Sequence, residues 1–246
     1  MFLKNIDPTV YDWNNEIRNK ILKKEQEDEF DYFTKYYELH SNFIQPTNIK
    51  INIPLFLEEI KKYHTLFRQW GENRNHLPRY GISLINYDGI IDNEYDIGCS
   101  PLDQYNENYR FRYNIKNQEI LHENDFIKKT EVYKNLSSLR PLDYFENLLI
   151  RSNILLWHKT ASFVPHLDTW PKKGSNYRLW GISGTEKDYT FAYLNKKVTN
   201  IEPGRIYLID TTQWHYAVAH SNYVYTFFLA LQGNYECYNL LKKCLL

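Results

Sequence analysis

The stretches SFVPHLD (162–168) and GRIYLIDTTQWHYAVAH (204–220) decide the expected fold. Each contains a short β-like run that leads into a polar segment. Because side chains alternate between the two faces of a strand, His166 and Asp168 are expected to project to one side. His215, at the start of a later strand, can then complete a triangle with them. These residue types and this order are typical of a two-histidine, one-carboxylate metal site with open coordination positions.

Strand-like runs continue on both sides of these stretches, from NILLWHKT (153–160) to NYVYTFFLALQ (222–232). Turn residues, such as Pro203-Gly204 and Ser221-Asn222, separate them. A series of closely spaced strands of this kind predicts a double-sheet jelly roll.

The first part of the chain, up to Gly71, has helical rather than strand periodicity. Apolar residues recur at helical spacing after Asp7-Pro8 and again between Pro54 and Gly71. Helices placed there would buttress one sheet from outside. We therefore predict an α+β chain with a double-stranded β-helix (jelly roll) core and N-terminal buttressing helices. It forms a single domain over 1–246, in which 1–150 are a helical and loop-rich elaboration and 151–235 are the core.

Four segments of the elaboration have more specific interpretations. The charged stretch 27–39 is predicted to be helical, and 141–150 to form one more short helix. The run RYGISLINYDG (79–89) predicts a strand closed by a turn at Asp88-Gly89. Residues 90–140 are polar and without periodicity, so we expect loops over an active site.

Composition excludes several kinds of partner. Thirty basic and thirty acidic residues give a formal net charge of zero, so no overall field would attract nucleic acid or an anionic membrane. No apolar run has the length of a signal peptide or a membrane span. Three cysteines without zinc spacing are expected to be reduced thiols. A cytoplasmic protein that acts on a small molecule is the expectation; the oligomeric state cannot be predicted.

The motif PHLD…PGRIYLIDTTQWH, with its surroundings from about 150 to 232, resembles the jelly-roll Fe(II)/2-oxoglutarate-dependent dioxygenases. Within them it looks most like the branch of free amino acid hydroxylases and aspartyl/asparaginyl hydroxylase-like proteins. The resemblance implies an enzyme that uses Fe(II), 2-oxoglutarate and dioxygen. His166, Asp168 and His215 would be the metal ligands, with no catalytic residues beyond them. The implied reaction decarboxylates 2-oxoglutarate to succinate and CO2 while hydroxylating a small polar substrate, such as a free amino acid or a derivative.

The distal carboxylate of 2-oxoglutarate requires a cation, for which arginine is best suited. Many relatives supply one about ten residues after the distal histidine, but here Thr226 lies near that place and 222–230 contain no lysine or arginine. Arg178 shares its predicted strand face with Trp180 and interrupts an apolar row. We predict that Arg178 is the anchor and that Thr226 adds a hydrogen bond. Alternatively, Arg178 pairs with an interior acid; Arg205 as anchor and His158 as a metal ligand are further alternatives.

Substrate contacts are expected from outside the jelly roll. Arg79, Arg110 and Arg112 could pair with a substrate carboxylate, and of the tryptophans near the motif we assign Trp180 to the substrate pocket, together with Arg79. Two other functions remain open. One is hydroxylation of a protein side chain by the same chemistry, and the other is a cupin-like sandwich that binds a metal or a small ligand without redox turnover.

Overall fold

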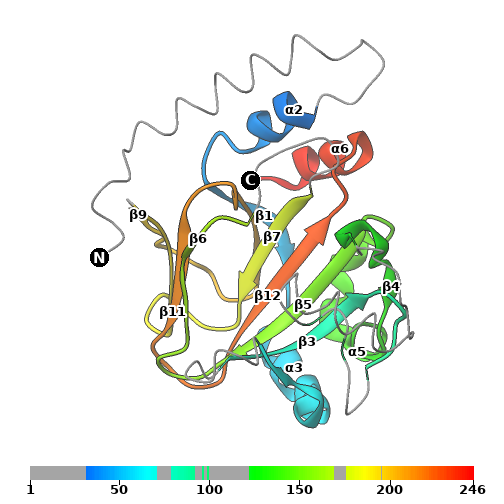
Figure 1. Ribbon diagram of the computed structural model, residues 1–246, viewed down its shortest axis with the longest axis vertical. Coiled ribbons are helices and arrows are strands. Elements are labelled where there is room, and N and C mark those ends of the chain that lie inside the picture. Colours follow the sequence, from blue (N-terminus) through cyan, green and yellow to red (C-terminus); the bar gives the residue numbers. More distant parts are fainter. Residues whose placement is uncertain are drawn as a thin grey trace, which may run out of the picture.

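The computed structural model describes residues 32–70, 79–91, 122–168, 176–194 and 196–246, together with Asp96 and Cys99. Among these residues, two antiparallel sheets face each other (Figure 1). The large sheet has the order β1 (Ile44–Lys50), β10 (Arg205–Ile209), β7 (Tyr177–Ile182), β12 (Val224–Leu231), β5 (Leu149–Trp157), β3 (Arg79–Asn86) and β2 (Arg68–Gln69), with β4 (Lys128–Lys129) paired to β3. The small sheet has the order β6 (Ser162–His166), β11 (His215–Ala219), β8 (Tyr189–Tyr193) and β9 (Lys196–Lys197).

The chain crosses between the two sheets at almost every turn after residue 149. Strands β5, β7, β10 and β12 belong to the large sheet, whereas β6, β8 and β11 belong to the small one. This alternation is that of a double-stranded β-helix. The predicted α+β fold with a jelly-roll core is therefore confirmed.

Two apolar layers hold the sheets in place. The inner layer lies between the sheets and is dominated by aromatic side chains, among them Trp157, Trp180, Tyr189 and Phe191. The outer layer covers the other face of the large sheet, where helices pack on strand residues such as Leu156 and Leu229. These helices are α2 (Tyr32–Leu39), α3 (Ile53–Glu59), η1 (Ile60–Leu66), α5 (Glu131–Asn135), η3 (Ser137–Phe145) and α6 (Tyr235–Cys244); the short η2 (Glu123–Asp125) lies beside β5. Buttressing helices are thus present, as predicted.

Several local predictions are refined by the structure. The helix expected between Pro54 and Gly71 is α3 followed by the 3-10 helix η1, and the one expected over 141–150 is instead the 3-10 helix η3. The helix expected after Asp7 lies outside the described residues, as does most of 90–140. Strand β1 and helix α6 were not predicted. β1 contains Pro46, which a sheet tolerates because β1 is an edge strand.

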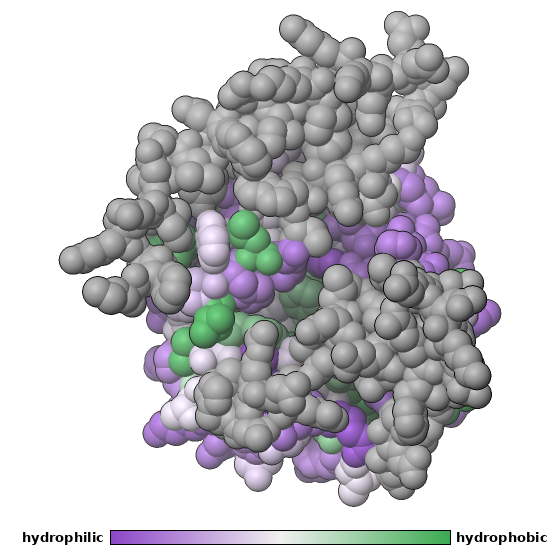
Figure 2. Space-filling view, in the orientation of Figure 1, coloured by the Kyte–Doolittle hydropathy of each residue, from purple (hydrophilic) through white to green (hydrophobic). Residues whose placement is uncertain are grey.

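The surface is mostly hydrophilic where the structure describes it. Figure 2 shows one face of the molecule, on which the described side chains are mostly hydrophilic and the hydrophobic ones form small groups. Cys99, Cys237 and Cys244 are buried and free, as predicted. Among the described helices, none combines the length and apolar character that crossing a membrane requires.

Among the glycines that the structure describes, Gly204, in the turn before β10, is expected to be the least tolerant of substitution. Its φ is +79°, and an added Cβ would lie 2.3 Å from the backbone oxygen of Ile51. We expect Gly204→Ala to lower the free energy of unfolding by about 3 kcal/mol, measured by urea denaturation. Gly89→Ala is the control, because Gly89 has φ +81° but more room, 3.2 Å from the oxygen of Lys129. Equal losses in the two variants would show that the close approach at Gly204 is unimportant.

Candidate metal centre

His166, Asp168 and His215 come together at one end of the small sheet. One possible ligand atom from each lies within 4.8 Å of the other two. Nε2 of His166 is 3.4 Å from Oδ1 of Asp168, and the two imidazole rings have centroids 4.4 Å apart. The three residues predicted from the sequence thus form one cluster in the described structure.

Strand register explains how the two histidines meet. His215 at the start of β11 pairs directly with His166 at the end of β6. The register then becomes irregular. The next paired residues are Phe163, three positions from His166 on β6, and Ala217, only two positions from His215 on β11. Such a bulge changes the direction in which side chains point. Here it lets Phe163 face the core while His166 still faces His215.

Asp168 reaches the cluster by a different route from the one predicted. Strand β6 ends at His166, so simple alternation along a strand does not place the carboxylate. Instead, the backbone N–H of Asp168 donates to the carbonyl of Thr211, in the loop that leads to His215 (3.1 Å). The loop that precedes His215 therefore also positions Asp168.

Both histidines have one ring nitrogen held by a backbone carbonyl. Nδ1 of His166 lies 2.7 Å from the oxygen of Val164, and Nδ1 of His215 lies 2.8 Å from that of Gln213. With Nδ1–H as the donor in each bond, Nε2 carries the lone pair that a metal ligand needs. The donor set therefore fits a divalent metal ion.

The electrostatics of the cluster favour a negative carboxylate. Burial opposes the ionisation of Asp168, but His166, His215 and Arg178 hold its pKa at about 2. Burial also disfavours protonated His166, yet Asp168 outweighs it and raises the pKa of that ring above its ordinary value. At His215, burial prevails and lowers the pKa. The site thus pairs a charged carboxylate with one strongly desolvated imidazole.

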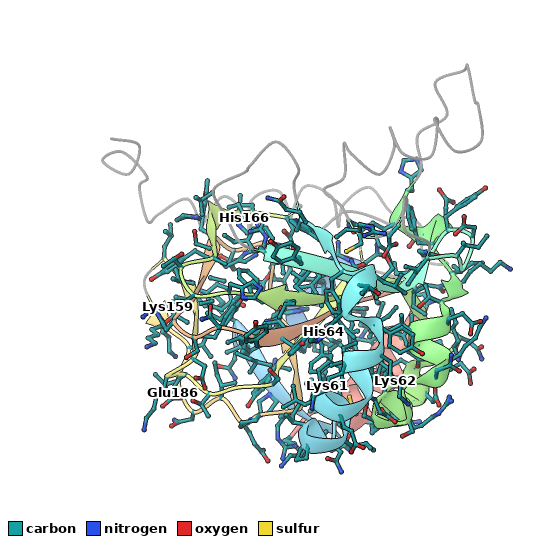
Figure 3. All side chains as sticks on the ribbon, turned by 90° about the horizontal axis from the view of Figure 1, so that it is seen from below. Lys61, Lys62, His64, Lys159, His166 and Glu186 are labelled. Atoms are coloured by element: carbon teal, nitrogen blue, oxygen red, sulfur yellow. The ribbon has the colours of Figure 1, made fainter. Side chains whose placement is uncertain are left out.

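Aromatic rings line the cluster on the core side. His215 lies 5.8 Å from Phe191 and 6.4 Å from Tyr193, and His166 lies 5.3 Å from Phe163, between ring centroids. Figure 3 shows His166 at the opposite edge of the molecule from Lys61 and Lys62 of η1. Helix η1, one of the buttressing helices, is therefore remote from the cluster.

Arg178 faces the jelly-roll interior, as predicted, and only 6% of it is exposed. Its guanidinium forms an ion pair with Glu123, whose carboxylate also accepts hydrogen bonds from Arg151 (3.2 Å) and Asn176 (3.1 Å). Sequence reasoning missed Glu123, which belongs to a polar segment with no strand pattern. The alternative, in which Arg178 pairs with an interior acid, is therefore present in the structure. The positive charge of Arg178 also helps to lower the pKa of Asp168.

Thr226 lies away from Arg178 along the sheet. Thr226 pairs with Ile182, whereas Arg178 pairs with Ala230, at the other end of the same ladder. The hydroxyl of Thr226 accepts a hydrogen bond from the indole of Trp157 (2.9 Å). The two side chains predicted to share one carboxylate therefore have separate surroundings.

The other candidates have structural contacts. Arg79 donates to the carbonyl of Ser162 (2.8 Å) and stacks on Phe163, and Trp180 packs against Phe191; both are almost fully buried. Arg205 pairs with Glu202. His158 contacts Tyr80 and Tyr223 and is not part of the cluster, and Arg110 and Arg112 lie outside the described residues.

Glu123 is expected to be important for stability, because it holds two arginines near the interior. Burial opposes its ionisation, yet Arg178 and Arg151 lower its pKa below the ordinary value. Glu123→Gln should lower the free energy of unfolding by about 3 kcal/mol, measured by urea denaturation at neutral pH. Glu202→Gln removes an exposed acid that pairs with Lys50 and Arg205 and should change stability little. A Glu123 variant as stable as the wild type would contradict a structural role for this carboxylate.

No family model and no curated protein matches the chain. A prolyl-4-hydroxylase from Pseudomonas putida is 10% identical, over 81% of this chain and 96% of its own, with a TM-score of 0.40. An oxidoreductase of the 2OG-Fe(II) oxygenase family from Burkholderia pseudomallei is 9% identical, over 84% and 93%, with a TM-score of 0.36. Similarity at this level transfers neither a reaction nor a substrate.

The strand topology and the cluster define the class of this chain more directly. It is a double-stranded β-helix with a two-histidine, one-carboxylate cluster where β6 and β11 meet. These are the two features that carried the resemblance to the Fe(II)/2-oxoglutarate dioxygenases, and the structure confirms both.

Proposed function

We propose that the chain is an Fe(II)/2-oxoglutarate-dependent dioxygenase that hydroxylates a small polar molecule, namely a free amino acid or a derivative of one. The observation that carries the proposal is the convergence of one ring nitrogen from each of two histidines with an ionised carboxylate. Three ligands of this kind leave coordination positions for a co-substrate and dioxygen, which a closed four-ligand structural site lacks. The neutral net charge favours a small substrate over a nucleic acid.

Each ligand would contribute in a distinct way. His166 and His215 would bind the metal through Nε2 while Nδ1 stays bonded to the backbone, and Asp168 would supply the negative charge. The bound iron, with 2-oxoglutarate and dioxygen, would supply the oxidative chemistry that converts 2-oxoglutarate to succinate and CO2 and hydroxylates a C–H bond. The aromatic side chains behind the cluster would exclude water from it.

Arg178 remains the proposed anchor for the distal carboxylate of 2-oxoglutarate. Its support is a side chain on the inner face of β7 whose positive charge reaches Asp168. Binding would require Arg178 to serve Glu123 and the co-substrate together, which a guanidinium with five N–H donors can do. Thr226 is not part of this proposal, because it lies at the other end of the strand ladder from Arg178 and its hydroxyl bonds to Trp157.

The test is turnover of 2-oxoglutarate by purified, iron-loaded protein, screened against the standard amino acids and close derivatives. Succinate formation that depends on one of them would support the proposal. Succinate formed with peptides but with no free amino acid would assign the chain to protein hydroxylation. Tight zinc binding without any dependence on 2-oxoglutarate would favour the cupin-like alternative.

A further inference from the structure

The loop between β10 and β11, residues 210–214, contacts two of the three candidate ligands through its backbone. The carbonyl of Thr211 accepts the N–H of Asp168 (3.1 Å), and the carbonyl of Gln213 lies 2.8 Å from Nδ1 of His215. Any shift of this loop would therefore move both ligands relative to His166. The position of the loop controls the geometry of the metal site.

Asp210 fixes the loop at its first residue. Its Oδ1 accepts hydrogen bonds from the backbone N–H of Thr212 (3.0 Å), the hydroxyl of Thr212 (2.6 Å) and the phenol of Tyr36 (2.9 Å). Its own N–H donates to the carbonyl of Phe43 (2.9 Å). Asp210 is 2% exposed, and a buried carboxylate needs such donors to offset the loss of water. The two bonds from Thr212 fix the turn of the loop itself, and the bond from Tyr36 joins the loop to a helix distant in sequence.

Tyr36 belongs to α2, which contributes no residue to the cluster. Its ring is stacked on His40 (3.9 Å between centroids) and on Tyr177 (5.8 Å). Stacking on these two rings and almost complete burial fix the direction of its hydroxyl. Helix α2 therefore provides a rigid support for Asp210.

We infer that Tyr36 and Asp210 are positioning residues for the metal centre. They hold the loop 210–214 so that Asp168 and His215 already face His166 before a metal ion binds. The inference rests on the proposed function only in requiring that the cluster binds a divalent metal. Supporting residues that orient ligands commonly contribute about 10- to 100-fold to metal affinity.

The test is Co(II) binding by the full chain and by Tyr36→Phe, followed through the visible d–d absorption of the bound ion under anaerobic conditions. We expect Tyr36→Phe to raise the Kd for Co(II) about tenfold. Tyr133→Phe is a matched control, since Tyr133 is also a buried helical tyrosine whose phenol donates to an aspartate, Asp143, at 2.8 Å. Tyr133 lies outside the loop 210–214. Tyr133→Phe should therefore leave the Kd for Co(II) unchanged, while it loses about as much stability as Tyr36→Phe.

A second variant tests the carboxylate itself. Asp210→Asn keeps the size of the side chain but removes its charge, and it should also weaken Co(II) binding about tenfold. Denaturation curves confirm that each variant is folded in the titration. Wild-type affinity in both Tyr36→Phe and Asp210→Asn would overturn the inference while leaving the proposed function intact. Failure of the wild type to bind Co(II) would overturn the metal site itself.

Discussion

Replacing His215 with alanine is expected to weaken the binding of Fe(II) or Co(II) by more than about 100-fold. The variant loses one of the three proposed ligands, and this loss should exceed the 10- to 100-fold effect of removing a group that only supports a ligand. His215 is buried, and its partner Gln213 contacts it only through a backbone carbonyl, so the variant should still fold. Isothermal titration calorimetry on metal-free protein measures the change.

His220→Ala is the control for this experiment. His220 follows the same strand, but its Nε2 lies 2.7 Å from the hydroxyl of Thr190, away from the cluster. Its removal should leave the metal affinity within about twofold of the wild type. Equal metal binding by wild type and His215→Ala would show that the ion is held elsewhere.

Arg178→Gln is expected to weaken 2-oxoglutarate binding by about 10- to 100-fold, which corresponds to the 1.5–3 kcal/mol contributed by hydrogen bonds to a charged group. Arg178→Lys keeps the charge but lacks the planar fork, so it should lose about tenfold. Both are measured as the Kd for 2-oxoglutarate with Co(II)-loaded protein. The Kd for Co(II) should change far less, since Arg178 is not a ligand.

Arg205→Gln separates the two arginines considered as anchors. Arg205, at the start of β10, pairs with Glu202 and donates to the carbonyl of Thr47. Its removal should leave the affinity for 2-oxoglutarate unchanged. An effect of Arg205→Gln together with none of Arg178→Gln would transfer the anchor to Arg205.

The core of the fold could be predicted because its information is local. Apart from the two-lysine strand β9, the strands from β5 to β12 are short, largely apolar runs bounded by turn residues, and the turn at Pro203-Gly204 uses a positive φ. The triad could be predicted because His166 and His215 lie at strand ends that the jelly-roll topology brings together. Both inferences depend only on residue type, spacing and the alternation of the sheets.

The remainder depends on contacts that spacing does not encode. Asp168 is placed by a hydrogen bond to Thr211, and not by alternation along β6. Arg178 pairs with Glu123, which lies 55 positions earlier in a segment without periodicity. Tyr36 donates a hydrogen bond to Asp210, which lies 174 positions later. Such partners are selected by the folded structure, so one sequence cannot identify them.

The most direct test of the central claim is anaerobic addition of Fe(II) and then 2-oxoglutarate to metal-free protein, followed by visible absorption. We predict a metal-to-ligand charge-transfer band in the wild type, because 2-oxoglutarate would occupy the coordination positions that the triad leaves open. The band should be absent in His166→Ala. Folded wild-type protein that binds Fe(II) but develops no band with 2-oxoglutarate would contradict the account.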